Sequence, residues 1–220
     1  MSDRIFRITV DGPSGAGKST IAKKVARELG IEYIDTGAMY RAVGFKVASE
    51  GVSPDDAKAI ENLMTNTDID LMEGRIMLDG IDVSDKIRTP EMSMMASKCS
   101  AIPAVREKLV EIQRDMGKRK SVIMDGRDIG TNVLKDAEYK IYLTASAEER
   151  AQRRFKELQG KGESQSYEDV LADIIQRDHN DMTRELNPLK KADDAIEIDS
   201  TGMNVEQVVS AVLKVICEDA

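Results

Sequence analysis

A short segment near the N-terminus combines glycines, a lysine and a hydroxyl at a spacing that suits phosphate chemistry. Gly12-Pro-Ser-Gly-Ala-Gly-Lys-Ser19 fits the pattern G-x-x-x-x-G-K-[ST], in which the backbone N–H groups of a glycine-rich loop cradle phosphate oxygens. The glycines would let this loop approach a ligand closely. Lys18 would reach the terminal phosphates, and the hydroxyl of Ser19 would bind a magnesium ion. The alternative is a glycine-rich turn without a ligand.

The sequence on either side of this loop supplies the elements that the pattern requires. The β-branched run at residues 4–10 predicts a strand. Residues 19–30 predict a helix, because Ile21, Val25 and Leu29 recur every four positions. A strand, a glycine loop and a helix then follow in the required order, and the helix N-terminus also favours an anion. This context favours a phosphate site over an empty turn.

Two further groups follow predicted strands. Asp35-Thr36-Gly-Ala-Met-Tyr-Arg41 places a hydroxyl at the end of a short strand and an arginine one turn into the next helix. Asp125-Gly-Arg127-Asp128 comes directly after the apolar run at residues 121–124. Because open α/β sheets bind ligands at the carboxyl ends of their strands, the first group is a candidate for holding an anionic substrate. The carboxylate that opens the second group could organise a magnesium shell. A helix start with a surface arginine and an Asp-Gly turn are the structural alternatives.

The predicted helix at residues 147–158 carries a cationic face. Arg150, Arg153 and Arg154 are spaced i, i+3 and i+4, ahead of the Gly160-Lys-Gly162 loop. A mobile arginine-bearing helix that closes over phosphates is a lid. The alternative is a solvated face that is paired with the neighbouring Glu148 and Glu149.

The next predicted helix, at residues 167–184, carries a second charged face. Arg177, Asp181 and Arg184 follow one another at i, i+4 and i+7, which suits either a substrate site or a surface salt bridge of ~0.3–0.5 kcal/mol. The only histidine, His179, lies on a different face, and we expect it to be a surface residue.

Composition restricts the class of protein. Hydrophobic residues make up 41% of the 220 residues, enough for a packed core. The net charge of −8 argues against general binding to nucleic acid or to an anionic membrane. Cys99 and Cys217 form neither a metal-binding nor a disulfide pattern. With no signal-like N-terminus and no apolar run approaching ~20 residues, we expect a soluble cytoplasmic protein.

The remaining pattern predicts an α/β protein. Apolar strands at residues 33–35, 121–124, 139–143 and 195–198 alternate with helices, which indicates a parallel sheet wrapped by helices on both faces. Residues 63–90 break this pattern, because apolar residues there alternate with period two around turns at Glu73-Gly74 and Asp79-Gly80. We therefore expect a small antiparallel β insert. Further helices are expected at 38–50, 54–64, 91–100, 103–116 and from a capping box at Asn204 and Gln207.

Phosphate binding alone does not define a reaction. The chain lacks the guanine-reading N-K-x-D of GTPase switches and the L-S-G-G-Q signature of transporter ATPases. It places arginines on loops and helices after the first strand instead. Small-molecule kinases need this arrangement, because two anionic substrates must be held while charge spreads over the transferred phosphoryl group.

Five motifs together resemble the bacterial-type cytidylate kinases, which are P-loop nucleoside monophosphate kinases. The motifs are G-P-S-G-A-G-K, D-T-G-A-M-Y-R, I-R-T-P-E (87–91), D-G-R-D-I-G (125–130) and R-D-H-N-D-M-T-R (177–184). The resemblance covers essentially the whole chain and implies transfer of the γ-phosphoryl group of ATP to CMP or dCMP, with Mg²⁺. It also implies one kinase domain over residues 1–220. Within that domain, the monophosphate-binding region would span residues 36–105, including the β insert, and the helical lid residues 148–168.

The resemblance implies roles for the residues that face ATP. The phosphates would contact the loop and its neighbours, namely Gly12, Pro13, Ser14, Gly15, Ala16, Gly17, Lys18, Ser19, Thr20 and Arg153. Catalysis would depend on charged groups around the transferred phosphoryl, namely Lys18, Asp125, Arg127, Arg150 and Arg154. Ser19 would be the metal ligand, although it stands where some members of the family have glycine.

The resemblance also implies roles toward the acceptor. The phosphate of CMP would be gripped by Arg41 and Arg127, with Arg184 nearby and Thr36 where family members often have serine. The cytosine base would be read by Ser97, Arg106 and Asp128, and the pentose would be contacted by Arg177 and Asp181.

Two other classes remain open. Another P-loop small-molecule kinase, acting on UMP, dephospho-coenzyme A or shikimate, would share the core but would not be expected to combine the β insert with D-G-R-D. A non-enzymatic nucleotide switch would need segments that report the γ-phosphate, and no partner-recognition segment is evident. The expected partners are ATP and CMP or dCMP, with no nucleic acid and no membrane, and the expected state is a monomer.

Overall fold

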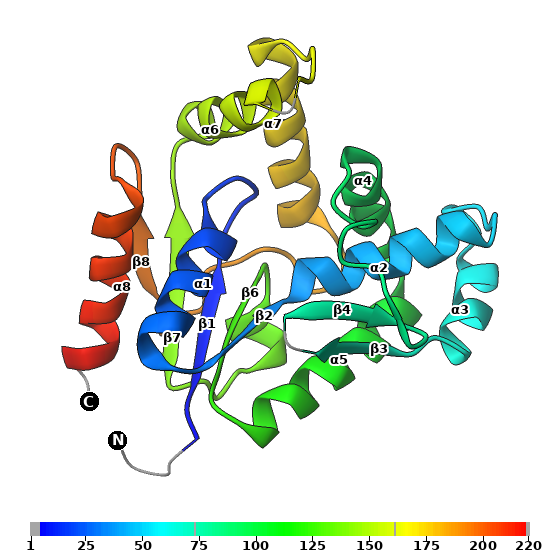
Figure 1. Ribbon diagram of the computed structural model, residues 1–220, viewed down its shortest axis with the longest axis horizontal. Coiled ribbons are helices and arrows are strands. Elements are labelled where there is room, and N and C mark those ends of the chain that lie inside the picture. Colours follow the sequence, from blue (N-terminus) through cyan, green and yellow to red (C-terminus); the bar gives the residue numbers. More distant parts are fainter. Residues whose placement is uncertain (1–4, 73, 161, 219–220) are drawn as a thin grey trace. The chain divides into compact units, whose positions relative to one another are not determined.

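A five-stranded sheet is the centre of the fold, with strand order β2-β6-β1-β7-β8 (Figure 1). The computed structural model describes residues 5–72, 74–160 and 162–218, so Arg4 of the expected first strand, Glu73 of the insert and Lys161 of the glycine loop lie outside it. β1 (Arg7–Asp11) pairs in parallel with β6 (Val122–Gly126) and with β7 (Tyr139–Thr144), and β7 pairs in parallel with β8 (Ile196–Asp199). β2 (Glu32–Asp35) is an edge strand.

The strands at the middle of this sheet are buried along their length. Ile8 and Val10 of β1 have no exposed surface, and neither do Val122, Ile123 and Met124 of β6. The apolar run of β6 is typical of parallel strands that are covered on both faces, and in β1 the polar Thr9 and Asp11 are buried as well. The sequence therefore places β1, and the loop that follows it, at the centre of the sheet.

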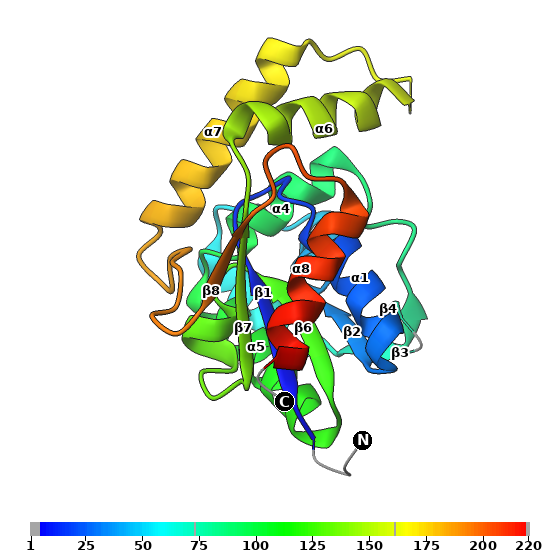
Figure 2. The ribbon, with the colours of Figure 1, turned by 90° about the vertical axis from the view of Figure 1, so that its left-hand side faces the viewer.

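Two helices lie side by side against the sheet, α1 (Lys18–Leu29) and α8 (Val205–Glu218) (Figure 2). Each has an apolar stripe that is buried, with Ile21 and Val25 in α1 and Val208 and Val212 in α8. The predicted capping box at the start of α8 is confirmed. The side chain of Asn204 accepts a hydrogen bond from the backbone N–H of Gln207, whose side chain accepts one from the backbone N–H of Asn204, each at 2.9 Å.

The chain divides into two compact units. One, which we call the sheet unit, contains the residues up to Glu32 together with those from Ser121 onward, and the other, the helical unit, is Tyr33–Lys120. The helices of the helical unit are α2 (Thr36–Ser49), α3 (Ala57–Thr65), α4 (Pro90–Cys99) and α5 (Pro103–Arg119). Its three-stranded sheet contains β3 (Ile69–Met72), β4 (Arg75–Leu78) and β5 (Ile81–Asp82).

The β insert forms as the period-two pattern predicted. β4 pairs in antiparallel fashion with both β3 and β5, with Leu78 opposite Ile69 on one side and Ile81 on the other. Alternate residues of these strands, including Ile69, Ile76 and Leu78, enter one core with the helices of the same unit. Lys46 of α2 forms an ion pair with the turn after β4, in which its Nζ lies 2.7 Å from a carboxylate oxygen of Asp79.

The segment that we expect to be a lid, residues 148–168, lies in the sheet unit and includes most of α6 (Ala147–Gly160) and the start of α7 (Tyr167–Thr183). The two helices pack against each other through a small core of their own, which is built from Ala151, Leu158, Val170 and Ile174. Of the helices that the structure describes, none combines the length and the apolar character that crossing a membrane requires.

The predicted class, a parallel sheet flanked by helices with a small antiparallel sheet added, is confirmed. One element was not predicted. After β6 the chain enters a single π-helical turn at Ile129–Val133, in which the carbonyl oxygen of Asp128 accepts hydrogen bonds from the N–H groups of Asn132 and Val133. Such turns often occur at functional sites, and this one follows directly on D-G-R-D.

Candidate active site

The glycine-rich loop connects β1 to α1 at the carboxyl end of the central strand. Gly12, Gly15 and Gly17 have φ angles of +149°, +76° and +87°, a region that residues with a side chain rarely adopt. A Cβ at Gly12 would lie only 2.0 Å from the carbonyl oxygen of Leu143 on β7. The shape of the loop is therefore set by close backbone contact, as a phosphate-binding loop requires.

Lys18, the first residue of α1, is buried beneath this loop. Its Nζ donates a hydrogen bond of 2.7 Å to the carbonyl oxygen of Pro13, and 6% of the residue is exposed. Burial, and after it the charge of Arg127, lower the pKa of Lys18 to about 7, although Asp125 and Asp11 act in the opposite direction. A polyphosphate in the loop would bring negative charge to this lysine and favour its charged form.

Ser19 and Asp125, which the sequence analysis connected separately with a magnesium ion, lie together. The hydroxyl of Ser19 donates a hydrogen bond of 2.8 Å to Asp125, which lies near the end of β6 and is 5% exposed. A hydroxyl and a carboxylate are oxygen ligands of the kind that Mg²⁺ prefers. No group of three His, Cys, Asp or Glu residues suited to a metal occurs in the described part of the chain. A metal ion here would need further oxygen ligands from water or phosphate.

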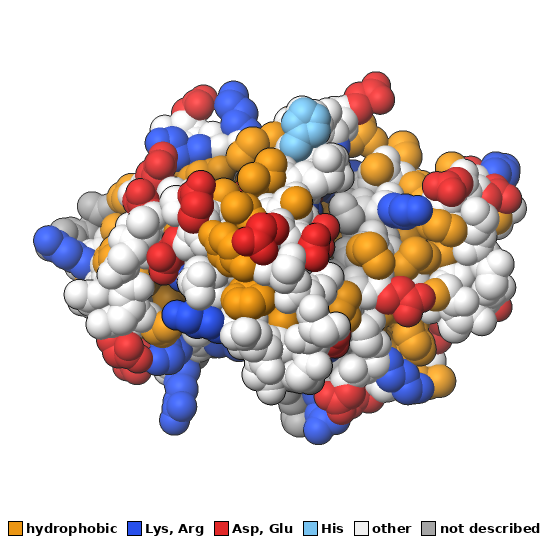
Figure 3. All heavy atoms as spheres, turned by 90° about the horizontal axis from the view of Figure 1, so that it is seen from above, with side chains coloured by type: hydrophobic (Ala, Val, Ile, Leu, Met, Phe, Trp, Pro, Cys, Tyr) orange, Lys and Arg blue, Asp and Glu red, His pale blue; other side chains and the backbone are white. Residues whose placement is uncertain are grey.

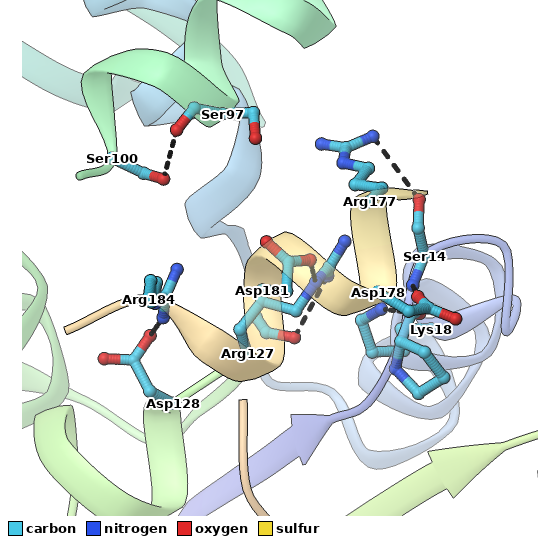
Figure 4. A network of polar contacts seen from close by, with 12 residues as sticks. Ser14, Lys18, Ser97, Ser100, Arg127, Asp128, Arg177, Asp178, Asp181 and Arg184 are labelled. Atoms are coloured by element: carbon cyan, nitrogen blue, oxygen red, sulfur yellow. Dashed lines mark hydrogen bonds and ion pairs between the residues drawn. The ribbon is translucent and has the colours of Figure 1, made fainter. Parts of the chain in front are cut away.

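Arg127 is held by a carboxylate from α7. Its Nε lies 2.7 Å from an oxygen of Asp181, which is 7% exposed (Figure 4). Burial lowers the pKa of Arg127, but the neighbouring Asp181 more than compensates and raises it above its usual value. Burial likewise raises the pKa of Asp181, and the charge of Arg127 outweighs this and lowers it. Both groups therefore remain charged near neutral pH.

A second ion pair joins the same two segments. Arg184, which follows α7, lies 2.9 Å from a carboxylate oxygen of Asp128 (Figure 4), and its Nε donates to the carbonyl oxygen of Asn187 at 2.7 Å. The other carboxylate oxygen of Asp128 accepts a hydrogen bond of 3.2 Å from the side chain of Asn132. The D-G-R-D and R-D-H-N-D-M-T-R motifs, which are distant in sequence, thus meet through two Arg–Asp pairs.

Arg150 of α6 is buried and contacts the glycine-rich loop. One guanidinium nitrogen, Nη1, lies 2.9 Å from the carbonyl oxygen of Ser14 and 2.6 Å from a carboxylate oxygen of Asp178, and Nε donates to the carbonyl oxygen of Ala145 at 2.9 Å. The other carboxylate oxygen of Asp178 accepts from the N–H of Ser14 at 3.3 Å, and Arg177 donates to the hydroxyl of Ser14 at 3.3 Å (Figure 4). A catalytic role for Arg150 would require it to leave these partners.

The other two arginines of α6 have different surroundings, so the three do not form one uniform cationic face. Arg153 lies 2.8 Å from the carbonyl oxygen of Ser200 and pairs with Glu149. Arg154 forms an exposed pair with Glu157 at 2.8 Å. On the adjoining helix, the histidine of the chain, His179, is exposed (Figure 3), as expected for a surface residue.

The helical unit positions the other predicted acceptor residues. Asp35 caps α2 by accepting a hydrogen bond from the N–H of Ala38 at 2.8 Å, and its second oxygen lies 3.1 Å from Arg41. Thr36, the first residue of α2, is 3% exposed. The predicted phosphate-binding arginine of this unit therefore also lies against a carboxylate.

The two predicted base-reading residues of the helical unit are connected through Ser100. Arg106 of α5 is 3% exposed, donates to the carbonyl oxygen of Ser100 at 3.3 Å, and lies over the ring of Tyr40 at 5.9 Å from its centroid. The hydroxyl of Ser100 donates in turn to the carbonyl oxygen of Ser97 at 2.8 Å. The end of α4 and the start of α5 thereby hold these two residues in one network.

Two carboxylates of the sheet unit were not singled out by the sequence analysis. Asp178 lies inside the R-D-H-N-D-M-T-R motif, and the motif itself was the signal that could have identified it. Asp11 directly precedes Gly12, and 4% of it is exposed. Burial raises the pKa of Asp11 to about 6, against the opposing effect of hydrogen bonds from the backbone of Gly130 and Ile129.

The site combines a glycine-rich loop and lysine after the central strand of a parallel sheet with an acidic residue at the end of the neighbouring strand. Arginines surround both. These features define a P-loop phosphotransferase. The family model described as cytidylate kinase matches residues 8–218. The chain therefore belongs to the cytidylate kinase family of ATP-dependent nucleoside monophosphate kinases, and the resemblance drawn from the five motifs is confirmed.

Named relatives are similar over nearly the full length. The cytidylate kinase of Caldicellulosiruptor bescii is 56% identical over 213 residues, which cover 95% of this chain and 94% of that protein. The cytidylate kinase of Clostridioides difficile is 50% identical over 206 residues, which cover 94% and 95%. A crystal structure of shikimate kinase from Bacteroides thetaiotaomicron has a TM-score of 0.50 at 14% identity, covering 98% of this chain and 99% of its own, and shares the fold alone.

Proposed function

We propose that this enzyme transfers the γ-phosphoryl group of ATP to CMP or dCMP, giving CDP or dCDP. The observation that carries the proposal is the junction of the D-G-R-D loop with α7. It places Arg127 and Arg184, which suit an acceptor phosphate, beside Asp128, whose carboxylate can accept a hydrogen bond from the amino group of cytosine. Similarity to proteins that are named cytidylate kinase supports the same acceptor.

On the donor side, the phosphates of ATP would lie in the loop of residues 12–19. The first backbone N–H groups of α1 favour an anion there, and Lys18 would meet the terminal phosphates. The contacts of Arg150 and Asp178 with Ser14 support the shape of the loop. Arg153 and Arg154 are partly exposed and are the residues of α6 that we assign to closure over the phosphates.

Mg²⁺ would be held at Ser19, with Asp125 beside it. Because the hydroxyl of Ser19 donates a hydrogen bond to Asp125, its oxygen lone pairs can face a cation. The ion, when bound, neutralises negative charge on the phosphates. The residues of the chain supply the positions of the oxygen ligands and the negative charge of Asp125.

On the acceptor side, the phosphate of CMP would replace carboxylates that now pair with arginines. Arg127 and Arg184 of the sheet unit are paired with Asp181 and Asp128, and Arg41 of the helical unit is paired with Asp35. Phosphoryl transfer demands positioning and stabilisation of charge more than covalent chemistry.

The nucleoside part of the acceptor would be read by the remaining polar residues. We assign the cytosine base to Asp128 together with Ser97 and Arg106. The pentose is assigned to Arg177 and Asp181.

We also propose that the enzyme works in the cytoplasm as a monomer on small-molecule substrates. The net charge of −8 supports the absence of nucleic acid among its partners.

A coupled assay of ADP release with CMP, dCMP, UMP, AMP and shikimate tests the reaction. We expect CMP and dCMP to be good acceptors, because cytosine offers Asp128 an amino donor where uracil presents an acceptor. Each mismatched buried group costs ~1–3 kcal/mol, so two mismatches give several decades of discrimination. Preferred phosphorylation of UMP, AMP or shikimate would refute the proposal.

The Asp128→Ala variant tests which residue reads the base. We expect its kcat/KM with CMP to fall far more than its kcat/KM with UMP, since only cytosine donates to the carboxylate. Asp115→Ala, at a half-buried position of α5 where the side chain pairs with Lys118, is the control and should behave as the wild type. If Asp128→Ala lowers both values by the same factor, Asp128 does not read the base.

A further inference from the structure

Asp11 is a buried carboxylate that the proposed reaction does not use. It is the last residue of β1 and 4% exposed. Within the part of the chain that the structure describes, it forms no ion pair. Burying a carboxylate without a counter-charge is unfavourable unless hydrogen bonds satisfy its oxygens. The groups that satisfy Asp11 therefore indicate why the chain places a charge here.

Both oxygens of Asp11 accept backbone hydrogen bonds from the segment after D-G-R-D. Oδ1 accepts from the N–H of Ile129 at 2.9 Å, and Oδ2 accepts from the N–H of Gly130 at 2.8 Å. These residues begin the π-helical turn, and the first N–H groups of a helical turn have no partner inside it. Asp11 thus caps this turn from a neighbouring strand.

Gly130 allows the turn to approach β1 this closely. A Cβ on Gly130 would lie 3.0 Å from the hydroxyl oxygen of Thr9 and 3.4 Å from Oδ2 of Asp11, closer than most side chains tolerate. On the other side, the register of the sheet places Asp11 beside Gly126. Arg127 and Asp128 therefore lie between two fixed points, the end of β6 and the pair of N–H groups that Asp11 holds.

We propose that Asp11 is a positioning residue for the acceptor site. Its carboxylate fixes the turn that sets the direction in which Arg127 and Asp128 leave β6, and the proposal rests on the roles assigned to these two residues above. Two acceptor oxygens are needed at once. Asparagine has nearly the same shape but only one acceptor oxygen, and its NH₂ group would face one of the two N–H donors.

Asp11→Asn is therefore the sharpest test, with Asp199→Asn as a matched control. Asp199 also ends a strand of the same sheet and accepts two hydrogen bonds, both from Thr201. KM values for CMP and for ATP are measured separately in each variant. An unpaired buried group costs ~1–3 kcal/mol, so we expect Asp11→Asn to raise the KM for CMP by about tenfold or more and the KM for ATP by less than about threefold. Asp199→Asn should change neither.

An equal rise of both KM values would overturn the proposal, because Asp11 would then act through the adjoining glycine-rich loop. An unchanged KM for CMP would overturn it as well. If Asp11→Asn does not fold, Gly130→Ala disturbs the same contact from the turn, and the same selective rise in the KM for CMP is expected. If Gly130→Ala raises the KM for CMP and the KM for ATP by the same factor, the positioning role of Asp11 is refuted.

Amide hydrogen exchange measures the positioning without any substrate. At least one of the N–H groups of Ile129 and Gly130, the one that faces the NH₂ group of the asparagine, should exchange at least about tenfold faster in Asp11→Asn than in the wild type, because its acceptor is lost. Unchanged exchange at both residues would overturn the proposal whatever the acceptor is. A wild-type enzyme that is inactive on CMP would refute the proposed function, and the exchange measurement would still decide whether Asp11 holds the turn.

Discussion

Breaking the Arg150–Asp178 pair should destabilise the sheet unit around its glycine-rich loop. The two groups lie 2.6 Å apart, with 6% and 13% of their side chains exposed, so water screens them little. Removing one partner of a buried pair costs about 3–5 kcal/mol, because the other charge stays buried. Arg150 would keep the carbonyl oxygens of Ala145 and Ser14 as partners. We therefore expect Asp178→Ala to lower the free energy of unfolding by about 3–4 kcal/mol and Tm by about 6–16 °C.

The assay is a double-mutant cycle of Arg150→Met and Asp178→Leu, with urea unfolding followed by circular dichroism. The double variant should be more stable than either single variant, because no charge is then left buried without a partner. Arg154→Met is the control, since its pair with Glu157 has side chains that are 34% and 49% exposed, and we expect it to change stability by less than about 1 kcal/mol.

The reasoning would be refuted if Asp178→Ala unfolded at the urea concentration of the wild type. It would also be refuted by a coupling energy below about 0.5 kcal/mol, the level at which independent sites add. Either result would mean that Arg150 is not held by Asp178 in solution and is free to serve as a lid arginine.

Three further predictions concern nucleotide binding. Lys18→Ala should leave a folded protein whose kcat is reduced about 10²–10³-fold, and at least half of the wild-type turnover at an unchanged Tm would contradict it. With a pKa of about 7, about nine-tenths of Lys18 is neutral at pH 8. Bound phosphates favour its charged form, so ATP binding at pH 8 should be accompanied by uptake of close to one proton. For the same reason, the affinity for ATP should fall as the pH rises above 7. Calorimetry in buffers of different ionisation enthalpy measures this uptake, and a buffer-independent enthalpy would exclude it. Residues 148–168 should be protected from hydrogen exchange only when both nucleotides or a bisubstrate analogue are bound, and equal protection with and without them would rule out closure.

Features encoded by neighbouring residues could be predicted from the sequence. The glycines of the phosphate loop, the alternation in the β insert and the capping box of Asn204 and Gln207 depend on residues a few positions apart. Local spacing therefore determines them, and the structure shows each in place. The sequence analysis also assigned the D-G-R-D and R-D-H-N-D-M-T-R motifs to one acceptor site, and the structure brings Arg127 and Asp128 of the first motif against Asp181 and Arg184 of the second.

Features that depend on tertiary packing could not be predicted. Helical spacing placed Arg150, Arg153 and Arg154 on neighbouring positions of one helix, but it does not tell what packs against each of them, and Asp178 comes from the next helix. The π-helical turn was missed for the same reason. Two of its N–H groups donate hydrogen bonds to Asp11, which is 118 and 119 residues away in sequence. No pattern of neighbouring residues therefore predicts this turn.

The contact at Gly12 has a consequence for how this sequence can evolve. A Cβ there would meet a backbone atom, the carbonyl oxygen of Leu143 at 2.0 Å, which is present whatever side chain occupies position 143. A change of side chain on β7 does not remove this atom, so the backbone itself would have to shift before another residue could occupy position 12. Gly130 is constrained differently, since a Cβ there would first meet side-chain atoms of Thr9 and Lys140, at 3.0 and 3.3 Å. A substitution at position 130 can therefore be accommodated by changes in neighbouring side chains, whereas one at position 12 needs a shift of the backbone of β7.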